Sequence, residues 1–399
     1  MQQPKIIFCV LLVSLVTLAR AEPPTNPIYN AGNQKFAMEL FQEVLRTEPG
    51  NLLVSPVSLQ MVMSVAAIGA RGPTQLEALD VLKLPPNEQI VVRTLNYIIS
   101  TLKGNENFAL NLANGLFVSD QFRINETFRS LVQRGFGAQV QTLDFQQREQ
   151  SSNAINNWVA QKTNNKIKEL VSPNELLPES RLFLLNAIHF KGNWLKPFDQ
   201  YDTILRPFHL DNGAVENVHM MQITDSFDYY DNGEYQLLSM PYEGGEASMV
   251  FILPRKGRSL QNVQLQNLIS APFTQQLVRV QIPRFSIETT VQFKPILEKM
   301  GMRHIFSRAA DLSGIGSDLI VDKVVQKTFI NVTEKGTEAA AATAGGVVTL
   351  SIPAPDHRVK SEFIADRPFL VVLHLINSPN ARRAQHPEYI LFTGRIASP

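Results

Sequence analysis

The amino-acid sequence predicts a fold that contains both α-helices and β-strands, the α+β class, with one central strand buried on both faces. Apolar residues recur at helical spacing over 33–45 and again after Pro56, so the first part of the chain should contain amphipathic helices. Residues 182–190 form a nearly continuous apolar run, which is typical of a central strand buried on both faces. Short strand-like runs between turn residues then fill the second half. Because no Pro-, Gly-, Ser-rich or charged linker divides the chain, we expect one large domain.

The first helix should carry its apolar stripe on Phe36, Leu40 and Val44 and end before Pro49. Ser55 is a suitable N-cap for the second helix, because Pro56 fits the first helical turn. Further strands are expected at 108–117, 182–190, 235–240, 248–253, 278–282, 319–332, 369–375 and 389–393, and further helices at 154–170 and 293–301.

The N-terminus has the pattern of a secretory signal peptide. Lys5 is followed by the apolar core 6–18 and by the small-x-small sequence Ala19-Arg20-Ala21. The apolar core is too short to span a bilayer, and no later window approaches 18 uninterrupted apolar residues. We therefore expect residues 1–21 to be removed, leaving a single secreted domain over 22–399 that does not associate with membranes.

Composition excludes several classes of protein. Without Lys5 and Arg20, 35 of the 37 basic residues remain against 36 acidic ones, so the mature net charge is about −1 and argues against a nucleic-acid partner. Cys9 is the single cysteine and leaves with the signal peptide. The mature chain then has no disulfide and depends on an ordinary large hydrophobic core.

Catalytic and metal-binding motifs are missing from the sequence. It contains no G-x-S-x-G, H-E-x-x-H or P-loop pattern, and its seven histidines do not have metal-ligand spacing. The lone G-x-G at Gly314 and Gly316 lacks the rest of a dinucleotide-binding motif. We therefore predict that the protein is not an enzyme and uses no cofactor or metal ion.

The stretch from Glu334 to Ser351 contains conflicting conformational preferences. Its consecutive alanines favour a helix, whereas Gly345-Gly346 and the β-branched residues after them oppose one. Read with the period of a strand, one face carries no charged or large side chain, and Glu338 falls on the other face. Such a segment can be a loop in one state and a strand in another. The uncharged face consists of Thr337, Ala339, Ala341, Thr343, Gly345 and Val347.

Several motifs in a fixed order resemble the serpin superfamily over essentially the whole mature chain. They are N-L-L-V-S-P-V-S at Asn51, N-A-I-H-F-K-G-N-W at Asn186, M-P-Y at Met240, S-M-V-F-I-L-P at Ser248, I-P-R-F at Ile282, F-I-N-V-T-E-K-G-T-E-A-A-A-A-T at Phe329, A-D-R-P-F at Ala365 and the terminal I-L-F-T-G-R-I. The resemblance implies the serpin fold, with a large mixed sheet, additional sheets and about nine helices. It also implies an exposed reactive loop, here about 336–362.

The resemblance further implies suicide inhibition of an extracellular serine protease by a monomer. The protease cleaves the loop and is trapped covalently while the loop inserts into the central sheet as a new strand. Inhibitory members have small residues in the hinge, which corresponds here to Gly336, Thr337, Glu338, Ala339, Ala340, Ala341 and Ala342. A non-inhibitory ligand carrier or storage protein is the alternative.

The resemblance leaves two positions for the reactive bond. Counting 17 positions from Glu334 as the first leads to Leu350-Ser351, which suits a chymotrypsin- or elastase-like protease. Counting backward from A-D-R-P-F leads to Arg358-Val359, which suits a trypsin-like protease. Leu350 is preferred, because the sheet fixes the length of the inserted strand, whereas the distal side tolerates insertions.

Two supporting clusters also follow from the resemblance. The breach, at the top of the sheet, corresponds to Trp194, Arg284 and Glu334, with an ion pair expected between the last two. The shutter, under the path of the loop, corresponds to Ser55, Ser58, Asn186 and Gln326. Gln326 stands where the family commonly has His, so the hydrogen-bond network can persist without the pH sensitivity of imidazole.

The sequence also carries signals for surface modification and polyanion binding. Asn125-Glu126-Thr127 is a glycosylation acceptor on a polar segment, so we expect a glycoprotein. Asn331 also matches the pattern but lies within a predicted strand. No Lys/Arg cluster strong enough for a heparin site occurs between Pro85 and Lys103, so we expect no heparin binding.

Overall fold

The computed structural model describes residues 27–102, 107–260, 263–337, 359, 361–376 and 389–399. Within these ranges it contains eight α-helices and three short 3₁₀ helices, close to the number expected. The helices are α1 Pro27–Thr47, α2 Pro56–Gly69, α3 Gly72–Val81, α4 Glu88–Leu102, α5 Glu126–Phe136, α6 Arg148–Lys162, α7 Leu265–Ile269 and α8 Lys294–Lys299, with η1 Pro173–Glu175, η2 Gln200–Asp202 and η3 His304–Phe306.

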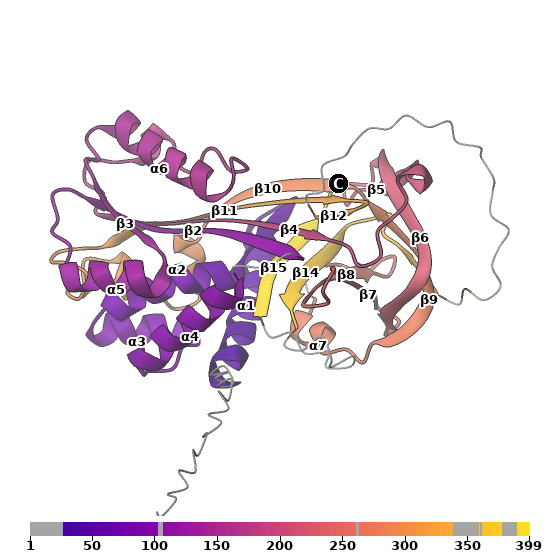
Figure 1. Ribbon diagram of the computed structural model, residues 1–399, viewed down its shortest axis with the longest axis horizontal. Coiled ribbons are helices and arrows are strands. Elements are labelled where there is room, and N and C mark those ends of the chain that lie inside the picture. The colour runs from indigo at the N-terminus through magenta and orange to yellow at the C-terminus, as the bar shows by residue number, and fades with distance from the viewer. Residues whose placement is uncertain (1–26, 103–106, 261–262, 338–358, 360, 377–388) are drawn as a thin grey trace, which may run out of the picture.

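A six-stranded mixed sheet crosses the molecule (Figure 1). Its spatial order is β10-β11-β12-β4-β2-β3, and β11 also pairs directly with β4 in parallel. The mixed central sheet predicted from the sequence is therefore present. Its strands are β2 Phe108–Ser119, β3 Gln139–Leu143, β4 Leu182–Asn193, β10 Phe285–Gln292, β11 Val321–Thr333 and β12 Gly336–Thr337.

A second, nine-stranded sheet has the order β1-β15-β14-β8-β7-β6-β9-β13, with β5 paired to β6. Its central strands β8, β14 and β15 are buried along their whole length. Its strands are β1 Leu52–Val54, β5 Ile204–His209, β6 Val215–Asp231, β7 Tyr235–Pro241, β8 Ala247–Pro254, β9 Thr274–Pro283, β13 Ser361–Ile364, β14 Phe369–Leu375 and β15 Tyr389–Ile396.

The six-stranded sheet separates two hydrophobic cores. On one face, α6 and the segment after it pack against β2 and β4 through Trp158, Phe117 and Phe183. The other face joins the main core, and Figure 1 shows α2 to α5 below the sheet and α6 above it. α2 is buried at every position, as expected of a largely apolar helix enclosed on all sides.

The predicted helix over 154–170 is wrong in its boundaries. α6 already begins at Arg148 and ends at Lys162. It ends there because Asn164 and Asn165 take left-handed backbone conformations, with φ of 51° and 59°. The Thr163 hydroxyl accepts a hydrogen bond from the Ile167 amide, which fixes the turn that follows. The apolar residues beyond the helix still join the core under α6 as an irregular segment.

Candidate functional site

The hinge predicted from the sequence enters the six-stranded sheet at its first two residues. Gly336 pairs with Thr333 of β11 and with Asn193 of β4, while Thr337 pairs with Val332 and Gly192. β12 thus lies between β11 and β4 and is antiparallel to both. The rest of the predicted hinge, Glu338 to Ala342, lies outside the described residues.

Glycine is the residue type that fits position 336, where the hinge enters the sheet. Its φ is +153°, which side chains other than hydrogen rarely permit. A Cβ here would also lie 2.2 Å from the carbonyl oxygen of Gly192 and 2.7 Å from the Cα of Asn193. The backbones of β12 and β4 approach closely for this reason, and a larger residue would push them apart.

Thr337 is fully buried in an aromatic setting at the end of the sheet. Its hydroxyl lies 2.7 Å from the hydroxyl of Tyr242, whose ring stacks on Trp194 at a centroid distance of 4.4 Å. Burial raises the pKa of Tyr242, so the phenol stays protonated and hydrogen-bonded. Tyr242 belongs to the M-P-Y motif, but sequence reasoning did not assign it to the hinge.

Below β12, β11 and β4 meet directly along a seam. Their parallel register runs from Val321–Leu182 to Phe329–His189. Beyond that pair the two strands are joined by β12 instead. Parallel pairing is slightly less stable per residue than antiparallel pairing. If β12 were extended by further residues, the longer strand would separate β11 from β4. It would then replace their direct parallel pairing by antiparallel pairing with each of them.

The structure brings the predicted breach residues together around the start of the hinge. The guanidinium of Arg284 contacts Glu334 Oε1 at 2.5 Å through Nη2 and 2.6 Å through Nε. Trp194 donates from its indole to the carbonyl of Thr333 at 3.0 Å and from its backbone to that of Lys335 at 2.9 Å. Thr203, which was not predicted, donates to the same carboxylate oxygen at 2.5 Å.

These contacts decide the charge of Glu334. Burial alone would raise its pKa, but the hydrogen bonds from Arg284 and Thr203 outweigh that effect and hold the pKa below its usual value. The carboxylate is therefore ionised at neutral pH. It ties the chain entering β12 to Arg284, between β9 and β10, and to Thr203, just before β5.

The predicted shutter residues form a buried hydrogen-bond network across the seam. Gln326 and Asn186 are direct register partners, and Gln326 Nε2 donates to Asn186 Oδ1 at 2.6 Å. Asn186 in turn donates to Ser58 Oγ and to Asn114 Oδ1, both at 2.5 Å. Asn114 was not predicted, although an Asn inside an otherwise apolar strand is a usable signal. The bond between Gln326 and Asn186 must break if a strand enters the seam.

Ser55 occupies the predicted N-cap position of α2 and also contacts the seam. α2 does begin at Pro56, but the Ser55 hydroxyl makes no capping hydrogen bond. Instead, its backbone N–H donates to Gln326 Oε1 at 2.7 Å and its carbonyl accepts from Gln326 Nε2 at 2.9 Å. Gln326 can hold both backbone groups because an amide both donates and accepts. The glutamine thus fixes the start of α2 on the seam.

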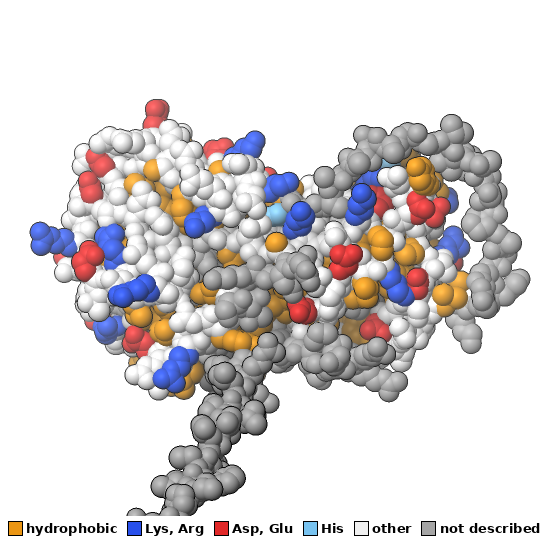
Figure 2. All heavy atoms as spheres, viewed as in Figure 1, with side chains coloured by type: hydrophobic (Ala, Val, Ile, Leu, Met, Phe, Trp, Pro, Cys, Tyr) orange, Lys and Arg blue, Asp and Glu red, His pale blue; other side chains and the backbone are white. Residues whose placement is uncertain are grey.

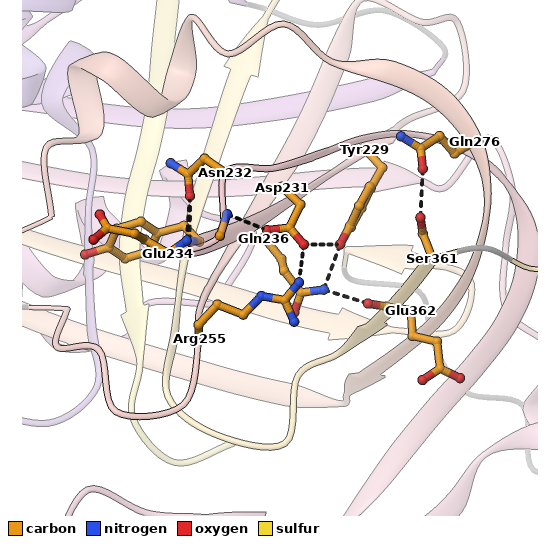
Figure 3. Close-up of polar contacts among 11 residues, drawn as sticks. Tyr229, Asp231, Asn232, Glu234, Gln236, Arg255, Gln276, Ser361 and Glu362 are labelled. Carbon is orange, nitrogen blue, oxygen red and sulfur yellow. Dashed lines mark hydrogen bonds and ion pairs between the residues drawn. The ribbon is translucent and has the colours of Figure 1, made fainter.

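The chain returns to the nine-stranded sheet at β13 through a polar cluster (Figure 3). Gln236, only 5% exposed, donates from Nε2 to the Tyr229 hydroxyl and to the Glu362 carbonyl, both at 2.7 Å. Ser361 donates to Gln276 Oε1 at 2.7 Å. These bonds hold the edge strand β13 in place, in addition to its parallel pairing with β9. Asp231 and Arg255 extend the cluster and line an open cavity of about 650 Å³.

The remaining predicted residues divide into two groups. Leu350, Ser351 and Arg358 lie outside the described residues, as does the proposed signal peptide, while Val359 is described but belongs to no strand. Asn125 is exposed at the N-terminus of α5, and its Oδ1 accepts from the Thr127 amide at 2.9 Å. Its Nδ2, the atom that a glycan would modify, is not used in that contact.

The part of the chain that the structure describes contains neither a candidate metal site nor a helix suited to crossing a membrane. No group of three or more His, Cys, Asp or Glu side chains could hold a metal ion there. None of the described helices combines the length and apolar character needed to cross a membrane.

Comparison with known proteins identifies the fold and the family. The model for "Serpin (serine protease inhibitor)" matches residues 31–399, so the chain belongs to the serpin family. Human serpin I2 is 33% identical over 385 residues, covering 92% of this chain and 91% of the relative. Porcine leukocyte elastase inhibitor is 32% identical, covering 93% of this chain and 99% of its own.

Solved structures agree with this assignment. Serpin48 from the insect Tenebrio molitor, described as a highly specific serpin, has a TM-score of 0.81 and 32% identity, covering 94% of this chain and 99% of its own. Thyroxine-binding globulin in complex with thyroxine has a TM-score of 0.80 and 25% identity, covering 93% of this chain and 99% of its own. The resemblance inferred from the motifs and the α+β serpin fold are thus confirmed.

Proposed function

We propose that this serpin is a secreted inhibitor of serine proteases that uses its loop as a suicide substrate. The observation that carries the proposal is β12, which forms the first two residues of a strand between β11 and β4. The small residues after Thr337 permit that strand to grow into the seam. The likeness to leukocyte elastase inhibitor supports inhibition, and the N-terminal pattern supports secretion.

The register of β12 indicates how far the new strand would reach. Continued along β4, it would set Glu338 opposite Lys191 and Val347 opposite Leu182, where β4 begins. Thr343 would fall opposite both Asn186 and Gln326. Its hydroxyl would then replace the hydrogen bond that these two residues make across the closed seam. The strand would end three residues before Leu350, which supports Leu350-Ser351 as the reactive bond.

Cleavage and insertion must occur in that order. The protease serine attacks the carbonyl carbon of Leu350, the bond to Ser351 breaks, and the new amino group departs with Ser351. The protease stays bound as an ester of Leu350. Freed from its distal root at β13, the segment after Thr337 enters the seam and carries the ester with it. The protease is displaced before water can hydrolyse the ester.

The free energy available is sufficient for this displacement. A dozen or so new hydrogen bonds, each contributing roughly 1 kcal/mol net, give on the order of 10 kcal/mol before apolar burial is counted. A protease domain is stable by only about 5–15 kcal/mol, so distortion of its active site is within reach. The serpin itself does no chemistry in this scheme and needs no cofactor.

Incubation with chymotrypsin, pancreatic elastase and trypsin, followed by denaturing electrophoresis and sequencing of the released peptide, tests the proposal. We expect a denaturant-stable adduct and a released peptide that begins at Ser351. A peptide beginning at Val359 would move the reactive bond to Arg358 and the target to a trypsin-like protease. Cleavage without an adduct would contradict inhibition.

The second candidate is a non-inhibitory ligand carrier. The likeness to thyroxine-binding globulin favours it, because that relative was crystallised with a small ligand. The cavity beside Gln236 is lined mainly by polar side chains, which suits a predominantly apolar ligand poorly. Failure of all three proteases to form an adduct would favour this alternative.

A further inference from the structure

A cavity lies beside β13, where strands from several parts of the chain come together. The end of β6, the start of β7, the residue after β8, the start of β9 and the first residues of β13 all line it. Its volume of about 650 Å³ falls within the range of about 300–1,000 Å³ that is usual for small-molecule sites. The cavity is therefore large enough for a ligand with more than one ring.

Polar groups on one part of the wall are held in place by a chain of contacts (Figure 3). Gln236 donates to the Tyr229 hydroxyl at 2.7 Å, and this hydroxyl donates to Asp231 Oδ2 at 3.4 Å. Arg255 pairs with the same carboxylate oxygen. Gln236 and Tyr229 are only 5% and 4% exposed, so these side chains have little freedom to turn. This part of the wall is thus formed before a ligand arrives.

A second part of the wall, on β9 and β13, is also polar. Gln276 Nε2 donates to Thr274 Oγ1, and Gln276 Oε1 accepts from Ser361 Oγ, both at 2.7 Å. Hydroxyl oxygens keep acceptor lone pairs after such bonds. A guanidinium has five N–H donors, and the pair between Arg255 and Asp231 occupies only one of its nitrogens. Donors and acceptors therefore both remain for a ligand.

The charges that line the cavity are balanced within the protein. Asp231 pairs with Arg255, and Glu362 pairs with Arg279 at 3.1 Å. Burial raises the pKa of Tyr229, so its phenol stays neutral. Figure 2 shows Lys and Arg side chains interspersed with Asp and Glu on the visible surface at the end of the molecule that carries β6 and β9. This distribution favours a neutral ligand over an ion.

We infer that the cavity beside β13 is a binding site for a neutral disaccharide. Each sugar hydroxyl both donates and accepts, as the side chains of this wall do. Tyr230 and Pro272 add flat apolar surface on which the C–H face of a sugar ring can pack. Arg255 is the main donor, and the hydroxyl of Ser361 is an acceptor. Because the cavity is open, it accommodates either a free disaccharide or the end of a glycan chain. The inference does not rest on the proposed function, since sugar binding needs no protease.

Calorimetric titration of the full chain with maltose, cellobiose, lactose, trehalose and diacetylchitobiose tests the inference. We expect at least one of these sugars to bind with a Kd on the order of 1 mM or lower. The bound sugar should raise the thermal midpoint as its concentration increases. The same sugar should then be presented at the end of a longer glycan. Equal affinity would identify a glycan chain as the ligand, and weaker binding would identify the free sugar.

Arg255→Met should weaken binding of that sugar by at least about tenfold, because hydrogen bonds from a charged donor are lost. Arg258→Met is the matched control. Arg258 follows in the same turn and pairs with Glu234 at 2.8 Å, with both side chains about half exposed, but it does not line the cavity. Its loss should leave the affinity within about twofold of the wild type. Both variants should keep the wild-type midpoint without sugar, since exposed ion pairs contribute little to stability.

Gln276→Leu is a second test that leaves the charges of the wall unchanged. It removes the amide that orients Thr274 and Ser361, and should weaken sugar binding by at least about threefold. Because the ligand is neutral, its affinity should not change between about 0.1 M and 1 M salt.

Three outcomes would overturn the inference. The first is that none of the five sugars binds at concentrations up to about 50 mM. The second is that Arg255→Met and Gln276→Leu bind the sugar as tightly as Arg258→Met does, which would place it elsewhere on the molecule. The third is that glucose 6-phosphate binds more tightly than every neutral sugar and loses affinity in salt, which would assign the cavity to an anion.

Discussion

The two sheets of this serpin differ in the contacts that hold their central strands together. The central strands β8, β14 and β15 of the nine-stranded sheet are buried and mainly apolar. The six-stranded sheet also packs between apolar cores, but its β11–β4 seam contains the buried Gln326–Asn186 bond and is separated at its end by two residues of β12. Apolar packing depends on fixed shapes, whereas one hydrogen bond can replace another. The polar seam is therefore the part of the molecule that can accept a new strand.

Among the variants that test this difference between the two sheets, Thr337→Arg should have the largest effect. Thr337 is fully buried, so an arginine would bring a charge into the seam and stop the strand from growing. We expect cleavage by the target protease to continue and the adduct to fall below about a tenth of the wild-type amount. The measurement is the ratio of adduct to cleaved serpin on a denaturing gel. Thr337→Val, which removes only the bond to Tyr242, is the control and should keep most of the adduct.

Leu373→Ala tests the nine-stranded sheet. Leu373 lies fully buried in β14, and its truncation should lower the free energy of unfolding by about 4 kcal/mol, because a cavity remains. The fraction of serpin that forms adduct should not change at a temperature where the variant is folded. Denaturant titration measures the first quantity and gel analysis the second. A selective loss of adduct would contradict the separate roles of the two sheets.

Asn186→Ala tests the seam. The substitution deprives Gln326, Ser58 and Asn114 of a buried partner and should cost about 3 kcal/mol of stability. Unlike Leu373→Ala, it should also speed the spontaneous loss of inhibitory activity on storage, because the closed seam is weakened. Asn111→Ala on β2, which removes a half-buried side chain 3.3 Å from the His189 ring, is the control and should cost about 1 kcal/mol. Equal storage lifetimes for Asn186→Ala and Asn111→Ala would contradict the claim that the Asn186 contacts keep the seam closed.

His374 gives the nine-stranded sheet its own pH dependence. Burial lowers the pKa of His374 to about 4 from the ordinary value of 6.5, so the imidazole is neutral in the folded state. Its contribution to stability is present above pH 6.5 and is lost as the pH falls from 6.5 towards 4, because the unfolded chain takes up the proton first. We expect a loss of about 3 kcal/mol over that interval. His374→Leu should flatten this part of the curve of unfolding free energy against pH.

Thr343→Val should have the smallest effect. The seam closes normally before cleavage, so the stability of the intact protein should stay within about 0.5 kcal/mol of the wild type. After insertion, Asn186 and Gln326 would lack the hydroxyl that replaces their mutual bond, which costs about 1–3 kcal/mol. The thermal midpoint of the cleaved variant should therefore be lower than that of the cleaved wild type. Thr349→Val, beyond the extended register, is the control.

The sequence predicted most of the fold because the strongest patterns are local. The apolar run at 182–190 became β4, and the strands expected at 369–375 and 389–393 became β14 and β15. The helix expected over 154–170 was misplaced, because Asn164 and Asn165 end α6 through backbone conformations that periodicity does not reveal. Apolar residues that follow a helix can join the same core without being helical.

The candidate site was only partly accessible to sequence reasoning. The resemblance to serpins led to Gln326, Asn186 and Glu334, which the structure places in the seam and at its end. Asn114, Thr203 and Tyr242 were missed because their contacts depend on the register between strands far apart in the chain.

The thermal stability of the protein before and after cleavage at Leu350 tests the central claim most directly. If the cleaved loop enters the seam, about 10 kcal/mol of new interactions should raise the unfolding midpoint by roughly 15 °C in a chain of this size. Thr337→Arg, cleaved in the same way, should show no such rise. An unchanged or lower midpoint for the cleaved wild type would contradict insertion between β11 and β4.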